Sequence, residues 1–354
     1  MDIIMNGQAQ GSVAATLLEA GMDANILRPY VGADGRHYVT LNQGGEPKAV
    51  PLSNATATLR KDDWIQLDSA VVKAAQPRLK AVADLRGRGL TYDIPNGMGR
   101  TVLETERQSD ISAAEVSMDG LRRSNEDRPV FDLVSLPLPI IHKDFGYTAR
   151  QIAVSRNGGS PLDTTTAELA ARKVAEEAEK LLLGTYGTYA FGGGTIYGYT
   201  NFPSRLTKTM TAPTASGWTP ATTVQEVLEM RDQAKDANHY GPYMLYTSSQ
   251  WDIYLDDDYS ANKGDNTLRD RLKAIQEVQD VMTLDYLSTS NAFVMVLVQL
   301  TSDVVREVMG MDITTVQWPE NGGMSMNFKV MAIMVPQLRA DINGNTGIVH
   351  GTTA

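Results

Sequence analysis

The interpretation of this chain begins at residues 130–145, VFDLVSLPLPIIHKDF. Apolar residues run through this strand-like stretch, and Pro137 and Pro139 interrupt it. Proline lacks the backbone N–H that a central strand needs, so two prolines in one strand favour an edge position. The densely charged run LRRSNEDR, residues 121–128, comes shortly before it. We therefore expect an extended ribbon over residues 121–158, with apolar side chains that pack on something outside their own domain.

A long helix is predicted after the ribbon. Ser160 is a suitable N-cap, Pro161 suits the first helical position, and Asp163 places an acid in the first turn. Gly184 is the expected end of the helix. At 1.5 Å per residue such a helix is about 35 Å long, and it would serve as the spine of its domain.

Two kinds of residue share the surface of this helix. One set recurs at helical spacing and predicts a buried apolar stripe: Ala170, Val174, Ala178, Leu181 and Leu182. The other set is charged and covers much of the rest: Arg172, Lys173, Glu176, Glu177, Glu179 and Lys180. Because acids and bases are interleaved, a solvated or inter-subunit charged face is favoured over a pair of catalytic carboxylates.

Shorter elements are predicted on both sides of the ribbon and the helix. A short helix and a short strand are expected before them, at residues 77–86 and 90–94. A glycine-rich linker and a compact unit that opens with a helix at Thr219-Pro220 are expected after them. Alternating apolar residues predict that the chain ends in two long strands of one sheet, at residues 312–318 and 326–335.

Composition excludes several classes of protein. The chain has 354 residues and no cysteine, so disulfide scaffolds, cysteine-bound zinc, iron–sulfur clusters and thiol nucleophiles are excluded. A net charge of −10 argues against a surface that grips nucleic acid throughout. The longest purely apolar run, residues 292–298, is far too short to cross a membrane, and the N-terminus lacks the features of a secretory signal. We expect the protein to be made and kept in a cytoplasm.

Three motifs resemble chemical sites, but none of them has the residues and spacing that the chemistry needs. The consecutive Asp256, Asp257 and Asp258 do not have the alternating spacing of a calcium loop, so a solvated loop is favoured. The glycine run 192–194 lacks the strand and helix of a phosphate-binding loop. An acid/base site at His142 and Asp144 remains a remote alternative, because no nucleophile motif accompanies it. We expect no catalytic, cofactor-binding or metal site.

Arginines concentrate in one part of the chain. They are Arg86, Arg88, Arg122, Arg123 and Arg128. We expect these arginines to form surface salt bridges. The functional alternative is that they contact an acidic neighbouring subunit or nucleic acid inside an assembly.

The order of these elements, together with four short motifs, resembles a known family. The motifs are ADLRGRGL at residues 83–90, LPLPIIHKDF at 136–145, Leu162-Asp163 before the helix, and GPYMLY at 241–246 followed by Trp251. They are similar to motifs of the shell-protein fold that tailed-bacteriophage major capsid proteins share with encapsulins. The resemblance covers about residues 77–350. It implies an α+β fold of the phage-capsid, Hong Kong-97 type, with an N-arm, an E-loop ribbon, a P-domain with a long spine helix, and an A-domain.

This resemblance also implies the domain organisation. The expected parts are an N-terminal arm (1–75), a first P-domain part (76–120), the E-loop ribbon (121–158), the P-domain spine helix and linker (159–217), the A-domain (218–311) and C-terminal P-domain strands (312–354). The first 75 residues are longer than the short N-terminal helix typical of cargo-loading encapsulins, and this favours a phage capsid protein.

The function implied by the resemblance is structural rather than enzymatic. The chain would self-assemble, through pentamers and hexamers, into the icosahedral shell around the double-stranded DNA genome of a tailed phage. It would form in the cytoplasm of a bacterial host, enclose DNA without reading its sequence, and have scaffolding, portal or decoration proteins as further partners. The alternative is an encapsulin-type compartment around an enzyme cargo. The expected assembly interface comprises Arg122, Arg123, Arg128, Phe131, Leu133, Leu136, Leu138, Ile140, Phe145, Asp256, Asp257 and Asp258.

Overall fold

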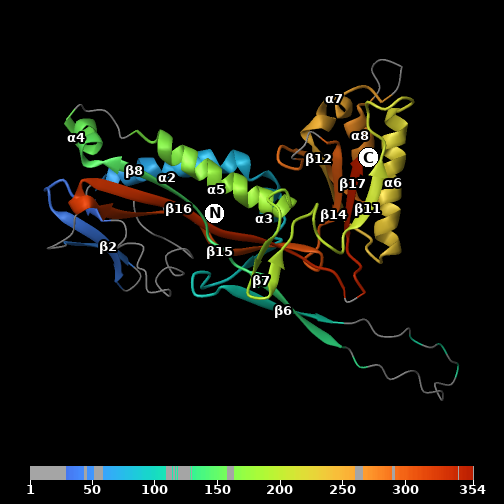
Figure 1. The fold of residues 1–354 in the computed structure, drawn as a ribbon, viewed down its shortest axis with the longest axis horizontal. Helices are drawn as coiled ribbons and strands as arrows, with labels where there is room; N and C mark the ends of the chain where they lie inside the picture. Colours follow the sequence, from blue (N-terminus) through green and yellow to red (C-terminus); the bar gives the residue numbers. More distant parts are fainter. Residues whose placement is uncertain are drawn as a thin grey trace. The chain divides into compact units, whose positions relative to one another are not determined.

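The computed structural model of the chain shows a mixed α and β protein (Figure 1). It describes residues 29–43, 46–51, 59–108, 114, 116, 118, 128, 130–157, 163–259, 266–288, 292–341 and 343–353. The chain forms two compact units, each assembled from separate segments. Unit 1 contains residues 1–101, 138–180 and 307–335, and unit 2 contains residues 102–137, 181–306 and 336–354. Within the described part of the chain, no helix is long and apolar enough to span a membrane.

Unit 1 is organised on a four-stranded sheet. Its order is β5 (Thr91–Asp93), β15 (Val305–Glu320), β16 (Ser325–Leu338) and β8 (Ile141–Thr148). The two long strands predicted near the C-terminus are therefore confirmed as neighbours in one sheet. Strand β8 pairs antiparallel with β16, which places Phe145 opposite Phe328.

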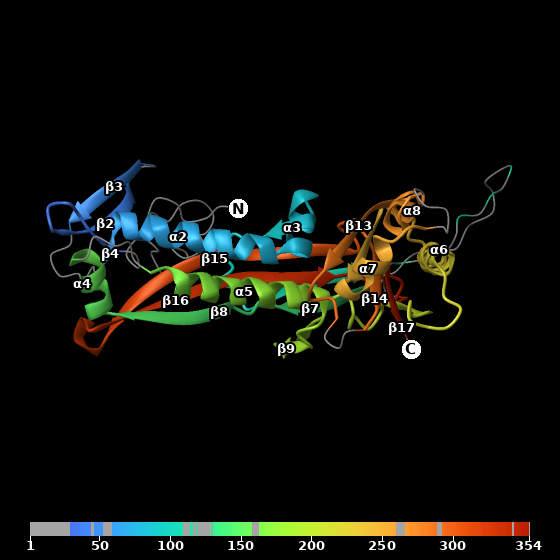
Figure 2. The same ribbon diagram turned by 90° about the horizontal axis from the view of Figure 1, so that it is seen from above.

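Helices cover this sheet. Figures 1 and 2 show α2 (Lys61–Ala75) and α5 (Thr165–Leu183) side by side over β15 and β16. Trp64 of α2 is fully buried, and its ring meets that of Phe328 edge-on at 6.0 Å. A 3-10 turn, Gln76–Arg78, joins α2 to α3 (Lys80–Gly87), while α4 (Ala149–Asn157) follows β8.

The spine helix predicted from the sequence is confirmed as α5, but it begins at Thr165, so Asp163 lies ahead of its first turn. Ala170, Val174 and Ala178 are all at most 4% exposed, so the apolar stripe faces the core. The chain leaves the helix at Gly184, which has a φ of +86° that favours glycine. Ser160 and Pro161 lie outside the described residues.

A second, smaller sheet precedes α2 in unit 1. Its order is β3 (Glu46–Pro51), β2 (His37–Gln43), β1 (Tyr30–Val31) and β4 (Leu59–Arg60). The sequence did not predict this sheet or helix α2. Both fall in the stretch that was expected to be the N-terminal arm (1–75).

Unit 2 contains a five-stranded sheet. The order is β11 (Leu206–Met210), β17 (Ile348–Thr353), β14 (Val294–Gln299), β12 (Tyr243–Ser248) and β13 (Val278–Leu284). All six residues of β12 and of β14 are buried, as expected of central strands. Helix α6 (Pro220–Asp236) packs against this sheet, and the short helices α7 (Asp252–Leu255) and α8 (Leu268–Lys273) contribute Leu255, Leu268 and Leu272 to the same core.

Two hairpin-like pairs complete unit 2. Strands β6 (Val102–Gln108) and β7 (Phe131–Pro137) form an antiparallel two-stranded ribbon. Strands β9 (Tyr189–Phe191) and β10 (Gly194–Ile196) form a smaller antiparallel pair within the stretch that was expected to be a linker. The apolar run at residues 130–145 is therefore two strands, since β7 ends at Pro137 and β8 begins after Pro139.

Candidate functional site

The ribbon β6–β7 changes in character along its length. Its register pairs Gln108 with Phe131 at one end and Val102 with Pro137 at the other. Phe131 and Leu133 are 58% and 55% exposed, whereas Leu136 is 6% exposed. The ribbon thus has a buried base and an end that presents large apolar side chains to solvent, the kind of surface that marks an interaction site.

The predicted interface residues between 122 and 140 fall into three groups. Phe131, Leu133 and Ile140 are exposed, and Arg128 is exposed as well. Leu136 and Leu138 are 6% and 5% exposed, so their apolar area is already covered within this chain and is not free to bury against a neighbour. Arg122 and Arg123 lie outside the described residues.

Phe145 also differs from its expected place. Its ring stacks on that of Phe328 with the centroids 5.1 Å apart, and it meets Tyr147 edge-on at 5.8 Å. Phe145 is partly buried, and these contacts make it part of an aromatic cluster in unit 1, where cross-strand pairing of β8 with β16 places it.

The acidic loop after α7 is exposed. Asp256, Asp257 and Asp258 all face solvent, and Asp256 accepts a hydrogen bond from Nε of Arg269 at 2.8 Å. Asp258 forms an isolated bridge with Thr267. Within the part of the chain that the structure describes, no group of three or more acidic or histidine side chains is arranged to hold a metal ion.

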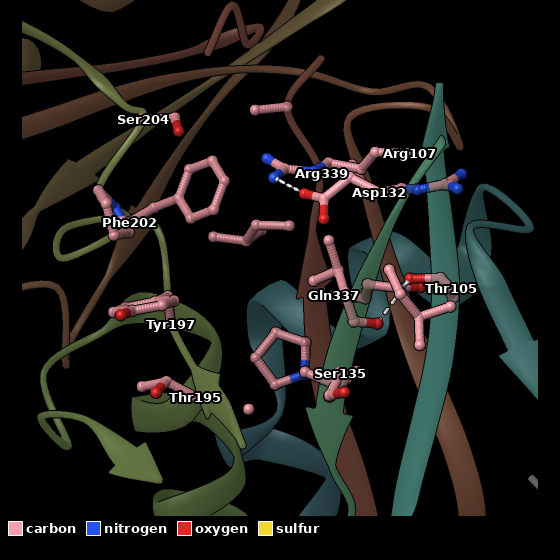
Figure 3. A pocket seen from close by; sticks show the side chains of 18 of the residues that line it. Thr105, Arg107, Asp132, Ser135, Thr195, Tyr197, Phe202, Ser204, Gln337 and Arg339 are labelled. Carbon is pink, nitrogen blue, oxygen red and sulfur yellow. Dashed lines mark hydrogen bonds and ion pairs between the residues drawn. The ribbon is translucent and has the colours of Figure 1, made fainter. Parts of the chain in front are cut away.

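A cavity of about 400 Å³ lies at the base of the ribbon (Figure 3). Strand β7 and residues 193–204 form its walls, and residues 336–340 complete the lining. Gln337 ties the ribbon to the rest of unit 2, because its Nε2 donates to Oγ1 of Thr105 at 3.1 Å and its Oε1 accepts from Arg306. At the ribbon's exposed side, Arg107 and Asp132 form a cross-strand ion pair. These contacts hold the ribbon in place.

Close backbone contact also fixes the base of the ribbon. A Cβ atom at Gly194 would lie 2.1 Å from the carbonyl oxygen of Ser135. Only glycine allows β10 to approach β7 this closely. The glycine run that was considered as a phosphate cradle is therefore part of a hairpin that supports the ribbon, with Gly192 and Gly193 at positive φ in its turn.

Two of the histidines have a charged neighbour. Nδ1 of His142 lies 3.7 Å from Oδ1 of Asp144, and both side chains are about half exposed on β8. His350 of β17 is more buried, and its Nδ1 accepts a hydrogen bond from Nε of Arg205 at 3.4 Å. Burial, followed by the nearby Arg205 charge, lowers the pKa of His350 to about 4, so this side chain is neutral at ordinary pH.

Two acids of the spine helix are buried, which makes the prediction of a solvated or inter-subunit charged face wrong for them. Glu176 is 6% exposed and pairs with Lys173 at 2.7 Å and Arg172 at 3.4 Å. Glu179 is 2% exposed and accepts hydrogen bonds from the backbone N–H groups of Ala81 and Val82.

A known protein family matches most of this chain. The model of a family described as "Family of unknown function (DUF6260)" matches residues 54–351, well over half of the chain. The chain belongs to this family.

Solved structures show that the DUF6260 chain has a shell fold. The virus-like particle of Pyrococcus furiosus matches with a TM-score of 0.57 at 16% identity, covering 80% of this chain and 97% of that one. The capsid of Myoviridae phage XM1 matches with a TM-score of 0.56 at 9% identity, covering 72% and 86% of the two chains. The predicted fold class, the α+β shell fold shared by tailed-phage capsid proteins and encapsulins, is thereby confirmed.

One curated relative of the DUF6260 chain adds sequence similarity. It is the Type 1 encapsulin shell protein EncA of Myxococcus xanthus (strain DK1622), which is 25% identical over 201 residues. The alignment covers 56% of this chain and 63% of EncA, so the chain spans less than two thirds of that relative's length. The resemblance to the encapsulin-like branch that the short motifs indicated is also confirmed.

Proposed function

We propose that this chain is a structural shell subunit, the major capsid protein of a tailed phage. The exposed apolar end of the ribbon, on a chain with a shell fold, is the observation that carries the proposal. Phe131 and Leu133 are more than half exposed. Burying a side chain of this size is worth about 1.5–3 kcal/mol, so a second copy that covers both gains a stable contact.

Assembly of many copies turns this modest contact into a closed shell. Each subunit gives its ribbon to one neighbour and receives a ribbon from another, which is a heterologous contact that closes into pentamers and hexamers. Each additional contact in a closed shell acts at a high effective concentration. The exposed loop Asp256–Asp258 is proposed to lie near the axes of these rings.

The phage assignment is favoured by the N-terminal part of the chain. Residues 30–60 contribute a four-stranded sheet ahead of α2, which is more structure than the short N-terminal helix that the resemblance associates with cargo-loading encapsulins. In this proposal the shell encloses double-stranded DNA, assembles in the bacterial host cytoplasm and becomes the virion capsid. Scaffolding, portal or decoration proteins are proposed further partners.

An encapsulin-type compartment is the second candidate. The similarity to EncA favours it, at 25% identity over 201 residues. Both candidates make the protein a self-assembling shell and differ in what the shell holds.

Negative-stain electron microscopy of the purified chain, with size-exclusion chromatography beside it, tests the shared part of the proposal. Closed icosahedral particles are expected, either from the chain alone or after co-expression with proteins encoded beside it. Small oligomers under both conditions would overturn the assignment as a shell subunit.

A further inference from the structure

Glu307 of β15 has a buried carboxyl group. Its side chain is fully buried, and neither carboxyl oxygen has a partner among the described residues. Its backbone is well held, because its N–H donates to the carbonyl oxygen of Leu90 at 2.9 Å. Burial raises the pKa of Glu307 to about 8, with Arg86 acting against this rise and Glu179 adding to it. The side chain is therefore mostly protonated at neutral pH.

The charged groups around Glu307 come from the elements that pack on β15. Glu179 of α5 is occupied by the backbone N–H groups of Ala81 and Val82, at 2.7 and 3.3 Å. Arg86 of α3 donates from Nη2 to Oδ1 of Asp312, further along β15, at 2.7 Å. Its Nε atom is buried and has no partner among the described residues.

The other charged side chains considered on neighbouring strands face solvent or interact with other residues. Asp93 of β5 is exposed, and Lys329 of β16 lies over the ring of Trp318 and 3.6 Å from Asp144. On α3 itself, Arg88 pairs with Asp84 at 2.8 Å. Arg86 is thus the cation that acts on Glu307, and it is already shared with Asp312.

From this arrangement we propose that Glu307 is a protonation latch. While its carboxyl group is protonated, Arg86 stays on Asp312 and α3 is held against β15. When the proton leaves to solvent, the new carboxylate repels Glu179 and draws Arg86 away from Asp312, which loosens this contact. The latch lies within unit 1 and does not depend on the proposed shell function.

The sign of the pH dependence follows from the two states of the chain. Unfolded, Glu307 ionises near its ordinary pKa of 4.5, and folded it ionises near 8. The stability that protonation provides is complete below pH 4.5, is lost as the pH rises to about 8, and is constant above. Relative to a chain without this carboxyl group, the folding equilibrium constant should fall about tenfold per pH unit in that window.

Urea unfolding of the full chain between pH 5 and 9 tests the latch. Glutamine has the shape of a protonated glutamate, so Glu307→Gln keeps the latch closed. The ratio of its folding constant to that of the wild type should rise about tenfold per pH unit up to about pH 8 and then stay level. An equal ratio at pH 5 and pH 8 would overturn the proposal.

A matched control comes from a second buried glutamate. Glu226 is 8% exposed and has one oxygen without a partner, but its other oxygen accepts from the backbone N–H of Thr211 at 2.8 Å. Glu226→Gln is measured beside Glu307→Gln, and an equal rise of the ratio in both variants would show that the effect is not particular to Glu307.

Two further measurements test separately the sharing of Arg86 and the protonation of Glu307. Asp312→Asn releases Arg86 to Glu307, so the rise in the ratio should end at a lower pH in that background. An unchanged end point would show that Arg86 is not shared. Infrared spectra of the wild type should contain a protonated carboxyl band at pH 6 that disappears by pH 9. Absence of this band at pH 6 would overturn the latch even if Glu307→Gln fails to fold.

Discussion

At the scale of single residues, Glu179 stabilises a helix to which it does not belong. The first N–H groups of any helix lack partners within it, and α3 has no N-cap side chain of its own to satisfy them. Glu179 reaches them from α5, with its carboxylate 2.7 Å from the N–H of Ala81 and 3.3 Å from that of Val82. A buried negative charge at a helix N-terminus also interacts favourably with the helix dipole.

Removing this contact should destabilise the chain. For Glu179→Ala we expect a loss of about 2 kcal/mol in the free energy of unfolding, because two backbone donors are left buried without partners. Urea unfolding at pH 7 measures this loss. Glu177→Ala, two positions earlier on the same helix, removes a partly exposed ion pair with Lys180 and should cost at most about 1 kcal/mol. Equal losses in the two variants would contradict the role given to Glu179.

The sequence could not reveal this role. Glu176, Glu177 and Glu179 form one acidic cluster in the sequence, yet two of them are buried and one is partly exposed. Successive helical residues are rotated by about 100°, so neighbours in sequence face different surroundings. Glu307 carried even less signal, because nothing in the pattern of β15 marks the position whose pKa Arg86 and Glu179 influence.

At the scale of elements, the helices and strands that were predicted are those with a long apolar pattern in the sequence. The spine helix α5 keeps one apolar stripe over many residues, the strands β15 and β16 are buried over most of their length, and all three were found. Helix α2 also carries a pattern, since Trp64, Leu67 and Val71 are buried on one face. It was missed because a glycine- and asparagine-rich stretch precedes it.

The spacing of apolar residues could not predict which strands pair in the ribbon. Residues 102–108 pair with residues 131–137, and no local pattern records a partner this far away in the sequence. The same limit applies to the candidate interface. Alternation cannot tell that Leu136 lies at the buried base of the ribbon while Phe131 and Leu133 lie at its exposed end.

The exposed end of the ribbon yields a prediction about assembly. The double variant Phe131→Asp, Leu133→Asp should leave soluble subunits that form no closed particles, because an acid in place of each apolar side chain must be desolvated at the contact. The matched control, Phe131→Leu with Leu133→Ile, keeps apolar area at both positions and should form particles. Electron microscopy and size-exclusion chromatography give the readout. Normal particles from the aspartate variant would contradict the ribbon's role as a contact between copies.

At the scale of the whole molecule, charge bears on what a shell of these chains encloses. Each chain carries a formal charge of −10. A shell of many copies therefore has a strongly acidic composition, and sequence-independent attraction of DNA phosphates needs clustered lysine and arginine instead. If the chain assembles as proposed, this composition favours a shell whose contents are put in place by other proteins and are not drawn in by the wall.

The contents of purified particles should distinguish the two shell assignments. If the chain is a phage capsid protein, particles isolated after expression of the chain in bacteria should contain no enzyme in constant proportion to the shell. Nucleic acid bound to them should dissociate as the salt concentration rises, since few phosphate contacts are available. Mass spectrometry of the particles and nuclease protection at low and high salt measure both properties. An enzyme that co-purifies in fixed stoichiometry and withstands high salt would assign the shell to the encapsulin type, because only a dedicated binding site on the inner wall holds one protein so selectively.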